Sequence, residues 1–526
     1  MSNTSEKTKR NESFSDSLFV YTESQLDQQD RSNDNDNQDS WKTKLVILIS
    51  MLIMPVGCHY MEATLSTLKT TLKETMSINN TQFSILMTSV TLVNTILPLF
   101  TGVFADDINW IGTVRGTMIV NIIIFIGSLM VTIGANYLNY PIMVAGQVIY
   151  GLGDGVIVTF QEAVLSRWFR HKQLSIVVGL MLSMARLTKF VAKLTCYPLV
   201  DAAGTFNRPI TVAVIFCAIS ILANVFYWIA MWKAGYATLS GRELSKPSSS
   251  YGIKIRDVTG TDDRSRLPFR FSYSVLLYLP GLFWMVPWLQ LTMSSVLSSF
   301  EDVATEYVQF RFTTSSVMAG IQSSLTQAVP IIAAPLLGLY VHRFGKTLSI
   351  LIGGTLFLVL SMALLGYTWA PPAVGMILYS FALSFGSVAL LSSASLLLPV
   401  ELAGLGVGIH KCANNIGTTI VSVIVGYVQD LTYHDGNPND NTTDLRYEYN
   451  GVIILYLSLS CFACLLAFLF WFLDRHTLDG WLQVNRKERE DRLILAGQES
   501  RKEKKEEYSS ERALQLVGSQ LLTKPS

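Results

Sequence analysis

The sequence predicts an all-α membrane protein with 12 transmembrane helices in two six-helix halves and with both termini in the cytosol. Of its 526 residues, 50% are hydrophobic and only 15% are charged, whereas soluble domains carry about 25% charged residues. About twelve apolar runs are long enough to cross a hydrocarbon core that is about 30 Å thick. A polar stretch at residues 233–270 divides these runs into six and six.

The predicted regions follow this division. Residues 1–40 are polar and rich in Ser, Asn and Asp, which is typical of a disordered tail. Residues 41–232 form the N-terminal six-helix half, and residues 271–473 form the C-terminal half. Residues 474–526 are dense in charges of both signs and predict a solvated cytosolic tail. The apolar runs centre near Leu52, Val93, Ile124, Tyr150, Arg186, Ile221, Phe283, Thr326, Phe357, Phe385, Gly417 and Phe462.

The distribution of cations predicts the orientation. The 233–270 stretch holds eight Lys and Arg residues against four Asp and Glu residues, and such an excess marks the cytosolic side of a membrane protein. An even number of spans then places both termini in the cytosol as well. The loops on the opposite side carry Asn-x-Thr sequons at Asn79 and Asn441, which we expect to be glycosylated.

Composition also excludes several function classes. A formal net charge of +1 argues against nucleic acid as a partner. The six cysteines lie in apolar runs, where buried thiols are the expected state rather than metal ligands. The polar regions contain no phosphate-binding loop and no Ser or Cys nucleophile arrangement. We therefore expect a non-enzyme without a cofactor or metal, whose partners are the lipid bilayer and a small-molecule solute, with a monomer as the transport unit.

Three cations interrupt the fifth apolar run. Arg186, Lys189 and Lys193 are spaced by three and four residues, which places them on one face of a helix. A charge at the centre of a bilayer costs a few kcal/mol or more. These side chains must therefore face a wet cavity or pair with acids. Lys193 has a further alternative, because it is nearly across the membrane and its amine could extend to the interface.

Depth estimates bring an acid to the level of these cations. At about 1.5 Å per residue, Arg186 lies roughly 18 Å into the fifth run and Asp154 roughly 21 Å along the fourth, both near the midplane. The two side chains could meet, or could hold the opposite ends of a zwitterion. Asp154 could instead carry a coupling proton, and Arg186 could serve only in a structural ion pair.

Weaker candidates for solute contact are polar side chains in other apolar runs. His59 follows Pro55 in the first run and could titrate near neutral pH, although a satisfied buried histidine is an equal alternative. Amides at mid-depth either line a cavity or join helices. These amides are Asn414, Asn415 and Gln322.

A repeated loop motif indicates that the two halves are structural repeats. Each copy is a Gly-x-x-x-polar stretch that leads into a short turn with Gly and a cation, and the small residue would let two helices approach closely. The first copy contains Gly102, Asp106 and Arg115, and the second contains Gly338, Arg343, Gly345 and Lys346. This motif resembles the loop signature of the major facilitator superfamily, with extra residues in the first copy and His342 where the family prefers Asp.

A closer resemblance lies between the fourth and fifth runs. Gly151-Leu-Gly153-Asp154-Gly155, then Gln161, then Ser183-Met184-Ala185-Arg186 are similar to the lysosomal dipeptide transporters of that superfamily. The resemblance implies that Arg186 meets a substrate carboxylate and makes Gln161 a further candidate for solute contact. It also implies an acid for the substrate amine at position 155, where this chain has Gly155, while Asp154 stands one residue, or roughly 100° of helix, earlier.

We therefore expect a secondary active or facilitative transporter that moves a small polar organic solute by alternating access. Lys189 is an added cation relative to the resembled family and favours an organic anion or an acidic peptide. The alternatives are a dipeptide or amino-acid uniporter of the lysosome or vacuole, and a sensor or scaffold that does not transport. The resemblance further implies a lysosomal or vacuolar membrane and a glycosylated single-span accessory subunit.

Overall fold

A computed structural model describes residues 41–104, 113–169, 172–238, 279–398, 403–432, 445–489, 491–492 and 495. It divides into two compact units. Of the described residues, those within Trp41–Val341 and Lys346–Leu482 belong to the larger unit, and His342–Gly345 and those from Gln483 onward belong to the smaller one. The predicted tail at 1–40, most of the predicted linker and the sequon at Asn441 lie outside the described residues.

The apolar runs of the N-terminal half form long helices of the larger unit. These helices are α2 (Trp41–Ile53), α3 (Val56–Thr67), α4 (Lys69–Met76), α5 (Asn80–Phe104), α6 (Thr113–Asn136), α7 (Tyr140–Trp168), α8 (Lys172–Ala203) and α9 (Asn207–Lys233). Pro55 separates α2 from α3 because its ring removes a backbone donor and clashes with the preceding turn.

The C-terminal half is built in the same way, with more interruptions. Its elements are η2 (Gly281–Trp284), α11 (Met285–Leu289), η3 (Gln290–Ser294), α12 (Ser295–Arg311), α13 (Ser316–Ser324), η4 (Leu325–Gln327), α14 (Ala328–Phe344), α15 (Thr347–Tyr367), α16 (Pro372–Leu396), α17 (Ala403–Thr432) and α19 (Asn450–Thr477). The segment η3 is a π-helical turn that runs directly into α12. Such turns are frequent at functional sites.

Local sequence explains where two of the N-terminal helices begin. Asn139 caps α7 by accepting a hydrogen bond from the Ile142 amide at 3.2 Å, with a proline in the first turn. Asn79 and Gln82 form a reciprocal pair at the start of α5, with side-chain to backbone hydrogen bonds of 2.7 and 3.0 Å. The Asn79 side chain is exposed at this end of the bundle, as the sequon requires.

Within the described ranges, eight helical segments are long and apolar enough to cross a membrane. They are Trp41–Thr67, Thr113–Asn136, Tyr140–Glu162, Asn207–Lys233, Ser316–Val341, Thr347–Tyr367, Pro372–Leu396 and Asn450–Thr477. The prediction of an all-helical membrane protein therefore agrees with the part of the chain that the structure describes. The count of twelve spans and the cytosolic position of the termini stay predictions.

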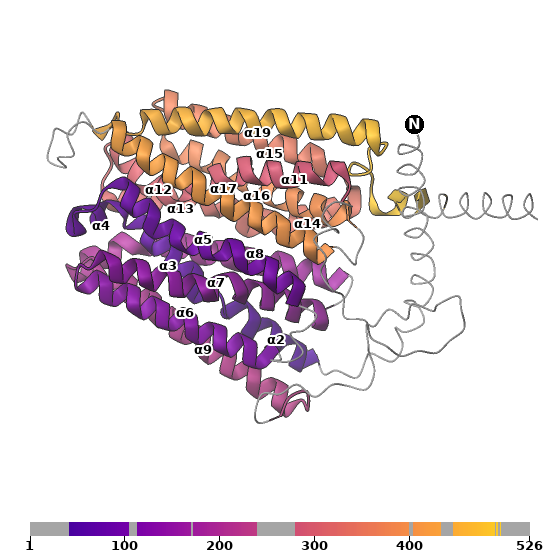
Figure 1. Cartoon of the computed structure of the whole chain (residues 1–526), viewed down its shortest axis with the longest axis horizontal. Helices are drawn as coiled ribbons and strands as arrows, with labels where there is room; N and C mark the ends of the chain where they lie inside the picture. Colours follow the sequence, from indigo (N-terminus) through magenta and orange to yellow (C-terminus); the bar gives the residue numbers. More distant parts are fainter. Residues whose placement is uncertain are drawn as a thin grey trace, which may run out of the picture. The chain divides into compact units, whose positions relative to one another are not determined.

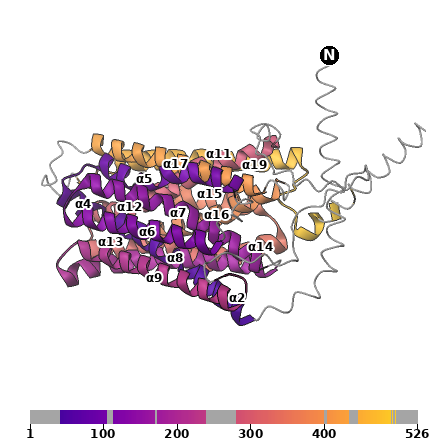
Figure 2. The ribbon, with the colours of Figure 1, turned by 60° about the horizontal axis from the view of Figure 1, so that its bottom comes forward.

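Each half has its own apolar core. One continuous cluster of buried side chains runs from Leu279 to Leu482 in the C-terminal half, and two clusters fill the N-terminal half. The halves meet where α5 lies along α17, α8 along α13, and α3 and α4 along α12. The helices of the larger unit run alongside one another in both views (Figures 1 and 2).

Small residues permit the closest helix contacts inside a half. A Cβ added at Gly57 of α3 would lie 2.5 Å from the Cα and 2.7 Å from the backbone nitrogen of Cys217 on α9. The Gly57 amide also donates to the Ser220 hydroxyl of α9 at 3.2 Å. Side-chain atoms at position 57 would therefore force backbone, rather than a flexible side chain, to move.

The loop motif behaves differently from the expectation at one position. Gly102 lies in α5, Arg115 is exposed at the start of α6, and Asp106 lies outside the described residues. A Cβ at Gly338 would meet no atom within 4 Å. The close helix approach that we expected at Gly338 is therefore not made, because this side of α14 faces outward from the bundle.

The turn of the second copy does need glycine. Gly345 has a φ of +71° and a Cβ there would collide with the Val484 carbonyl, a contact within the smaller unit. The next residue, Lys346, also has a left-handed backbone at a φ of +55°. The Arg343 guanidinium lies 5.4 Å from the ring centre of Phe344.

Two glycine substitutions test whether close helix packing, rather than membership of the loop motif, makes a glycine necessary for stability. Gly57→Ala should lower the apparent melting temperature of the detergent-solubilised protein, because overpacking against backbone costs about 1–3 kcal/mol. Gly338→Ala should leave it unchanged or raise it slightly, since alanine favours the helix by about 1 kcal/mol. Fluorescence-detected thermal unfolding measures both variants, and equal losses would contradict the packing described for α3 and α9.

Candidate solute-binding cavity

A polar cavity of about 260 Å³ lies between the two halves of the larger unit. Helices α3, α5, α7 and α8 contribute its N-terminal wall, and α12, α16 and α17 contribute the C-terminal wall. Its charged lining residues are Glu62, Asp154, Arg186, Lys189, Glu301 and Asp302. Five of the eight residues predicted to contact a solute line this cavity: Arg186, Lys189, Asp154, Asn414 and Asn415.

Lys189 is held by two carboxylates, one from each half. Its amine lies 2.8 Å from Glu62 Oε1 on α3 and 3.1 Å from Glu301 Oε1 on α12. Lys189 is 9% exposed. The cation is therefore matched within the protein and acts as a bridge across the cavity wall rather than as a free anion-binding group.

Arg186 keeps more freedom. Its Nη1 lies 3.6 Å from Glu301 Oε2 and donates to Gln327 Oε1 at 3.1 Å. Gln327 is fully buried in the short turn η4, between α13 and α14, which fixes the acceptor. Because a guanidinium has five donors in a fixed plane, Arg186 retains donors that can bind a carboxylate in the cavity.

Lys193 does not reach the membrane interface. Its side chain is completely buried, and its amine donates to the backbone carbonyl of Glu301 at 2.8 Å. The interface alternative is therefore wrong for this residue, because α8 turns its cationic face toward α12 and not toward lipid. Arg186, Lys189 and Lys193 all meet Glu301.

Asp154 lies in a group of hydrogen-bond acceptors. It accepts from the Asn94 Nδ2 of α5 at 3.1 Å, and none of the described cations forms an ion pair with it. Two further lining acceptors, Asn94 Oδ1 and Gln147 Oε1, have no hydrogen-bond partner although their residues are 8% and 2% exposed. Buried acceptors without partners are costly, so this wall of the cavity is suited to a donor such as an ammonium group.

At position 155, where the resemblance implies an acid, the structure leaves no room for a side chain. A Cβ at residue 155 would lie 2.7 Å from the Asn94 Cγ and collide with its Oδ1. Asn94 thus occupies the space that a side chain at position 155 would need. Asp154 reaches the cavity from one position earlier on α7, with the Asn94 amide to orient it.

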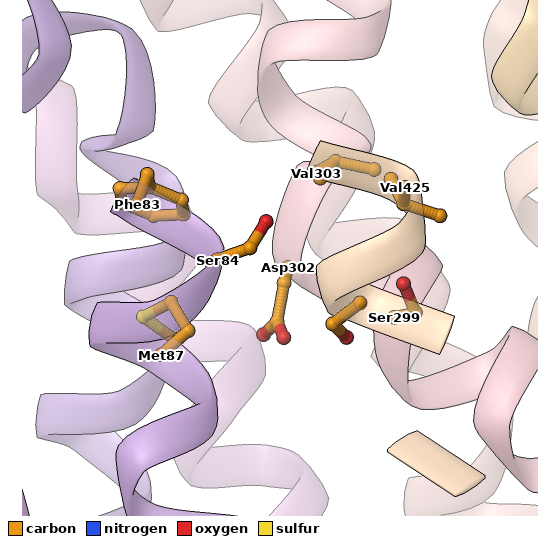
Figure 3. A pocket seen from close by; sticks show the side chains of 8 residues that line it. Phe83, Ser84, Met87, Ser299, Asp302, Val303 and Val425 are labelled. Carbon is orange, nitrogen blue, oxygen red and sulfur yellow. The ribbon is translucent and has the colours of Figure 1, made fainter. Parts of the chain in front are cut away.

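Asp302 is a second carboxylate without a matched cation. It lines the main cavity and a neighbouring space of about 10 Å³, which has room for about one water molecule. Figure 3 shows its carboxylate between Met87 of α5 and Ser299 of its own helix. Among the described side chains it has no ion-pair partner within 4.0 Å.

Three predicted residues lie outside the cavity lining. Gln161 is buried and donates to the Met51 carbonyl at 2.8 Å, so it joins α7 to α2. His59 lies behind the wall, with Nδ1 at 4.0 Å from Glu62 Oε2. Gln322 is on α13, with its Oε1 buried and unpartnered. All three are polar residues of membrane helices, but none of them lines the central cavity.

Sequence reasoning missed three of the acids that line the cavity. These are Glu62 on α3, and Glu301 and Asp302 on α12. Counting membrane-embedded carboxylates with the same weight as the cations would have found them, because a chain with buried cations must supply buried anions. Among the described residues, no group of three His, Cys, Asp or Glu side chains is placed to hold a metal ion.

A bundle of membrane helices that encloses a charge-lined cavity between two halves defines a solute carrier. Comparison with known proteins identifies the group. Residues 51–422 match the Major Facilitator Superfamily model, and the chain belongs to this family. The resemblance drawn from the loop motif is therefore confirmed.

Individual relatives are more distant. The chain is 24% identical to the lysosomal dipeptide transporter MFSD1 of Mus musculus over 399 residues, covering 74% of this chain and 80% of the relative. The Homo sapiens and Danio rerio proteins of the same name are 24% and 23% identical over similar spans. A crystal structure of a mutant of the nucleoside transporter NupG superposes with a TM-score of 0.59 at 13% identity, over 81% of this chain and 98% of that chain, which shows the fold alone.

The bridge at Lys189 generates a test. Lys189→Met should lower the unfolding free energy by about 1–3 kcal/mol, because it leaves Glu62 and Glu301 without their nearest cation in a partly wet site. Lys189→Met combined with Glu62→Gln should recover part of that loss. Thermal unfolding of the single and double variants measures the coupling, and strictly additive losses would argue against the bridge.

Proposed function

We propose that this transporter carries small zwitterionic peptides, with dipeptides as the central class, by alternating access between its two halves. The observation that supports this is the pairing of unlike groups in one cavity. Arg186 offers free donors on one side, while Asp154, Asn94 and Gln147 offer acceptors on another. A solute with a carboxylate and an ammonium group would satisfy both sets.

The charge balance argues against an anion. Four carboxylates line the cavity, against two cations. Our preference for an organic anion or an acidic peptide rested on Lys189, and that amine is already matched by Glu62 and Glu301. A second negative charge on the solute would face Asp154 and Asp302 in a space of low dielectric, where like charges repel strongly.

Size and relatives point the same way. A cavity of about 260 Å³ lies just below the range of drug-sized ligand sites, roughly 300–1,000 Å³, which favours a small solute. The curated relatives at 22–24% identity are named lysosomal dipeptide transporters. We therefore assign Arg186 to the substrate carboxylate, and Asp154 with Asn94 to the substrate amine. Asn415 holds the wall by donating to the Asn94 carbonyl at 2.9 Å.

The same relatives supply the proposed setting. We place the chain in a lysosomal or vacuolar membrane, with Asn79 on the lumenal side and glycosylated. A glycosylated single-span accessory subunit belongs to this proposal. Fluorescent tagging against lysosomal and plasma-membrane markers tests the location, and glycosidase treatment of Asn79→Gln tests the sidedness.

Chemically capped peptides provide the sharpest test of the binding mode. In proteoliposomes, an unmodified neutral dipeptide should be taken up, whereas its N-acetyl and C-amide forms should each lose about tenfold or more in kcat/KM, since one charged contact is removed. Dicarboxylates should be transported poorly. Radiolabelled uptake or counterflow measures all four solutes in one preparation.

Variants assign the two ends. Arg186→Gln should abolish the preference for the free carboxylate over the C-amide, and Asp154→Asn should abolish the preference for the free amine over the N-acetyl form. Gln161→Leu is the matched control, a buried polar residue outside the cavity whose loss should not change this selectivity. Selective uptake of dicarboxylates would overturn the proposal in favour of the anion carrier, and absence of flux for every solute would favour the scaffold.

A further inference from the structure

A second buried charge cluster lies at the end of the bundle that carries Asn79, away from the cavity. Its centre is Glu306 of α12, whose side chain is fully buried. Glu306 Oε2 lies 2.6 Å from the Lys69 amine, and Oε1 lies 2.8 Å from the Lys73 amine. Oε2 also accepts from the Tyr449 hydroxyl at 2.6 Å and from the Gln429 amide at 3.2 Å.

A second acid extends the cluster. Glu448 accepts from Gln429 at 2.5 Å and from the Asn80 side chain at 3.2 Å, and lies 3.8 Å from the Lys73 amine. Next to it, Asp430 of α17 accepts from the backbone amides of Asn80 and Thr81, each at 2.9 Å. The first turn of α5 is thereby fastened to the end of α17.

The cluster joins the two halves and is not a solute site. Its cations lie on α4 in the N-terminal half, and its acids come from α12 and the segment before α19 in the C-terminal half. The side chains of Lys69 and Glu306 have no exposed surface. Every charge at its centre already has an opposite charge within 3.8 Å, so none of these charges is left to bind a charged ligand.

If the two halves separate here, the acid and the two lysines differ in how many of their bonding partners they retain. Glu306 retains Tyr449 and Gln429, which belong to its own half. Lys69 and Lys73 form their described ion pairs only with residues of the other half. Separation therefore exposes two lysines that must be rehydrated, whereas the acids stay hydrogen-bonded in place.

The same helices connect this cluster to the cavity. On α12, Asp302 lines the cavity four residues before Glu306, so the two lie on one helix face. In the other half, Glu62 of α3 lines the cavity and Lys69 opens α4, seven residues later. A movement that parts α3 and α4 from α12 must open cavity and cluster together.

The opposite end of the bundle carries a weaker connection. There, Lys411 of α17 pairs with Glu162 of α7 at 3.1 Å, with side chains 27% and 36% exposed. An exposed pair of this kind contributes about 0–1 kcal/mol. The fully buried Lys69–Glu306 pair at the Asn79 end is screened far less by water.

We propose that Lys69, Lys73 and Glu306 form a lock that holds the Asn79 end of the transporter closed. In this lock, the C-terminal half holds the acid in place through Tyr449 and Gln429, and α4 supplies the two cations. The lock is intact in this structure and must break in the state that admits solute from the Asn79 side. This inference rests on the two-half transporter architecture and not on the substrate class.

Thiol accessibility tests the lock without any substrate. Val90→Cys places a reporter in the cavity wall, and a membrane-impermeant thiosulfonate is applied to each face of oriented vesicles in turn. The parent chain, with its six native cysteines, gives the background. Glu306→Gln added to the reporter should raise the labelling rate from the Asn79 face about tenfold, because the neutral amide no longer holds the two lysines.

Three companion variants give each outcome a meaning. Glu74→Gln, an exposed acid of the same helix α4, should leave the rate unchanged. Lys69→Glu with Glu306→Lys, combined with Lys73→Gln so that no cation faces the new lysine, should restore slow labelling by re-forming the Lys69–Glu306 pair in reverse. If Glu306→Gln does not fold, as judged by size-exclusion elution, Lys73→Gln serves instead, because its partly exposed side chain tolerates change better.

A labelling rate in Glu306→Gln or Lys73→Gln equal to that of Glu74→Gln would overturn the lock. Failure of the peptide assignment would leave these rates unaffected, since no peptide is present. Conversely, a lock that behaves as expected in a protein that does not carry peptides would reject only the proposed substrate.

Discussion

The matching of buried charge across the interface of the two halves is the constraint on which the rest of the structure depends. Two acids of α12 pair with four cations of the N-terminal half: the Glu301 carboxylate with Arg186 and Lys189, and the Glu306 carboxylate with Lys69 and Lys73. A fifth cation, Lys193, donates to the backbone carbonyl of Glu301. Each ion loses several kcal/mol of hydration when it is buried. The pairings offset that loss only if α12 faces α4 and α8 in this register, so the charges specify how the halves meet.

This constraint also explains which features the sequence could predict. Apolar runs report the membrane-facing surface, and they place the helices well because lipid contact is a property of each helix alone. The spacing of Arg186 and Lys189 predicted one polar face, and depth alone brought Asp154 to the same level. The ion-pair partner of each buried charge cannot be predicted in this way. Lys69 and Glu306 are 237 residues apart in the sequence, and no local pattern states which of several buried acids a lysine meets.

The level along a helix accounts for a further difference. Gln161 and Asp154 are seven residues apart on α7 and therefore share one helix face. However, α7 approaches α2 at Gln161 and the cavity at Asp154. A sequence gives the face of a residue but not the neighbour that covers this face at each level. Gly338 is a related case, because a small residue allows two helices to approach closely but does not require them to do so.

The internal pairing of the cavity cations has a consequence for the transport cycle. A carrier that works without a second solute must return empty, and an empty cavity with unmatched cations would resist closing. Here Lys189 and Arg186 are paired with carboxylates of the protein when no solute is bound. Their charges therefore stay compensated when the solute-free carrier changes conformation. Among the described side chains, no cation pairs with Asp154 or Asp302, although Asp154 accepts a hydrogen bond from the Asn94 amide. The wall that gains most from a bound solute is therefore the acidic one, and the ammonium group, more than the carboxylate, should decide how firmly the solute is held as the halves move.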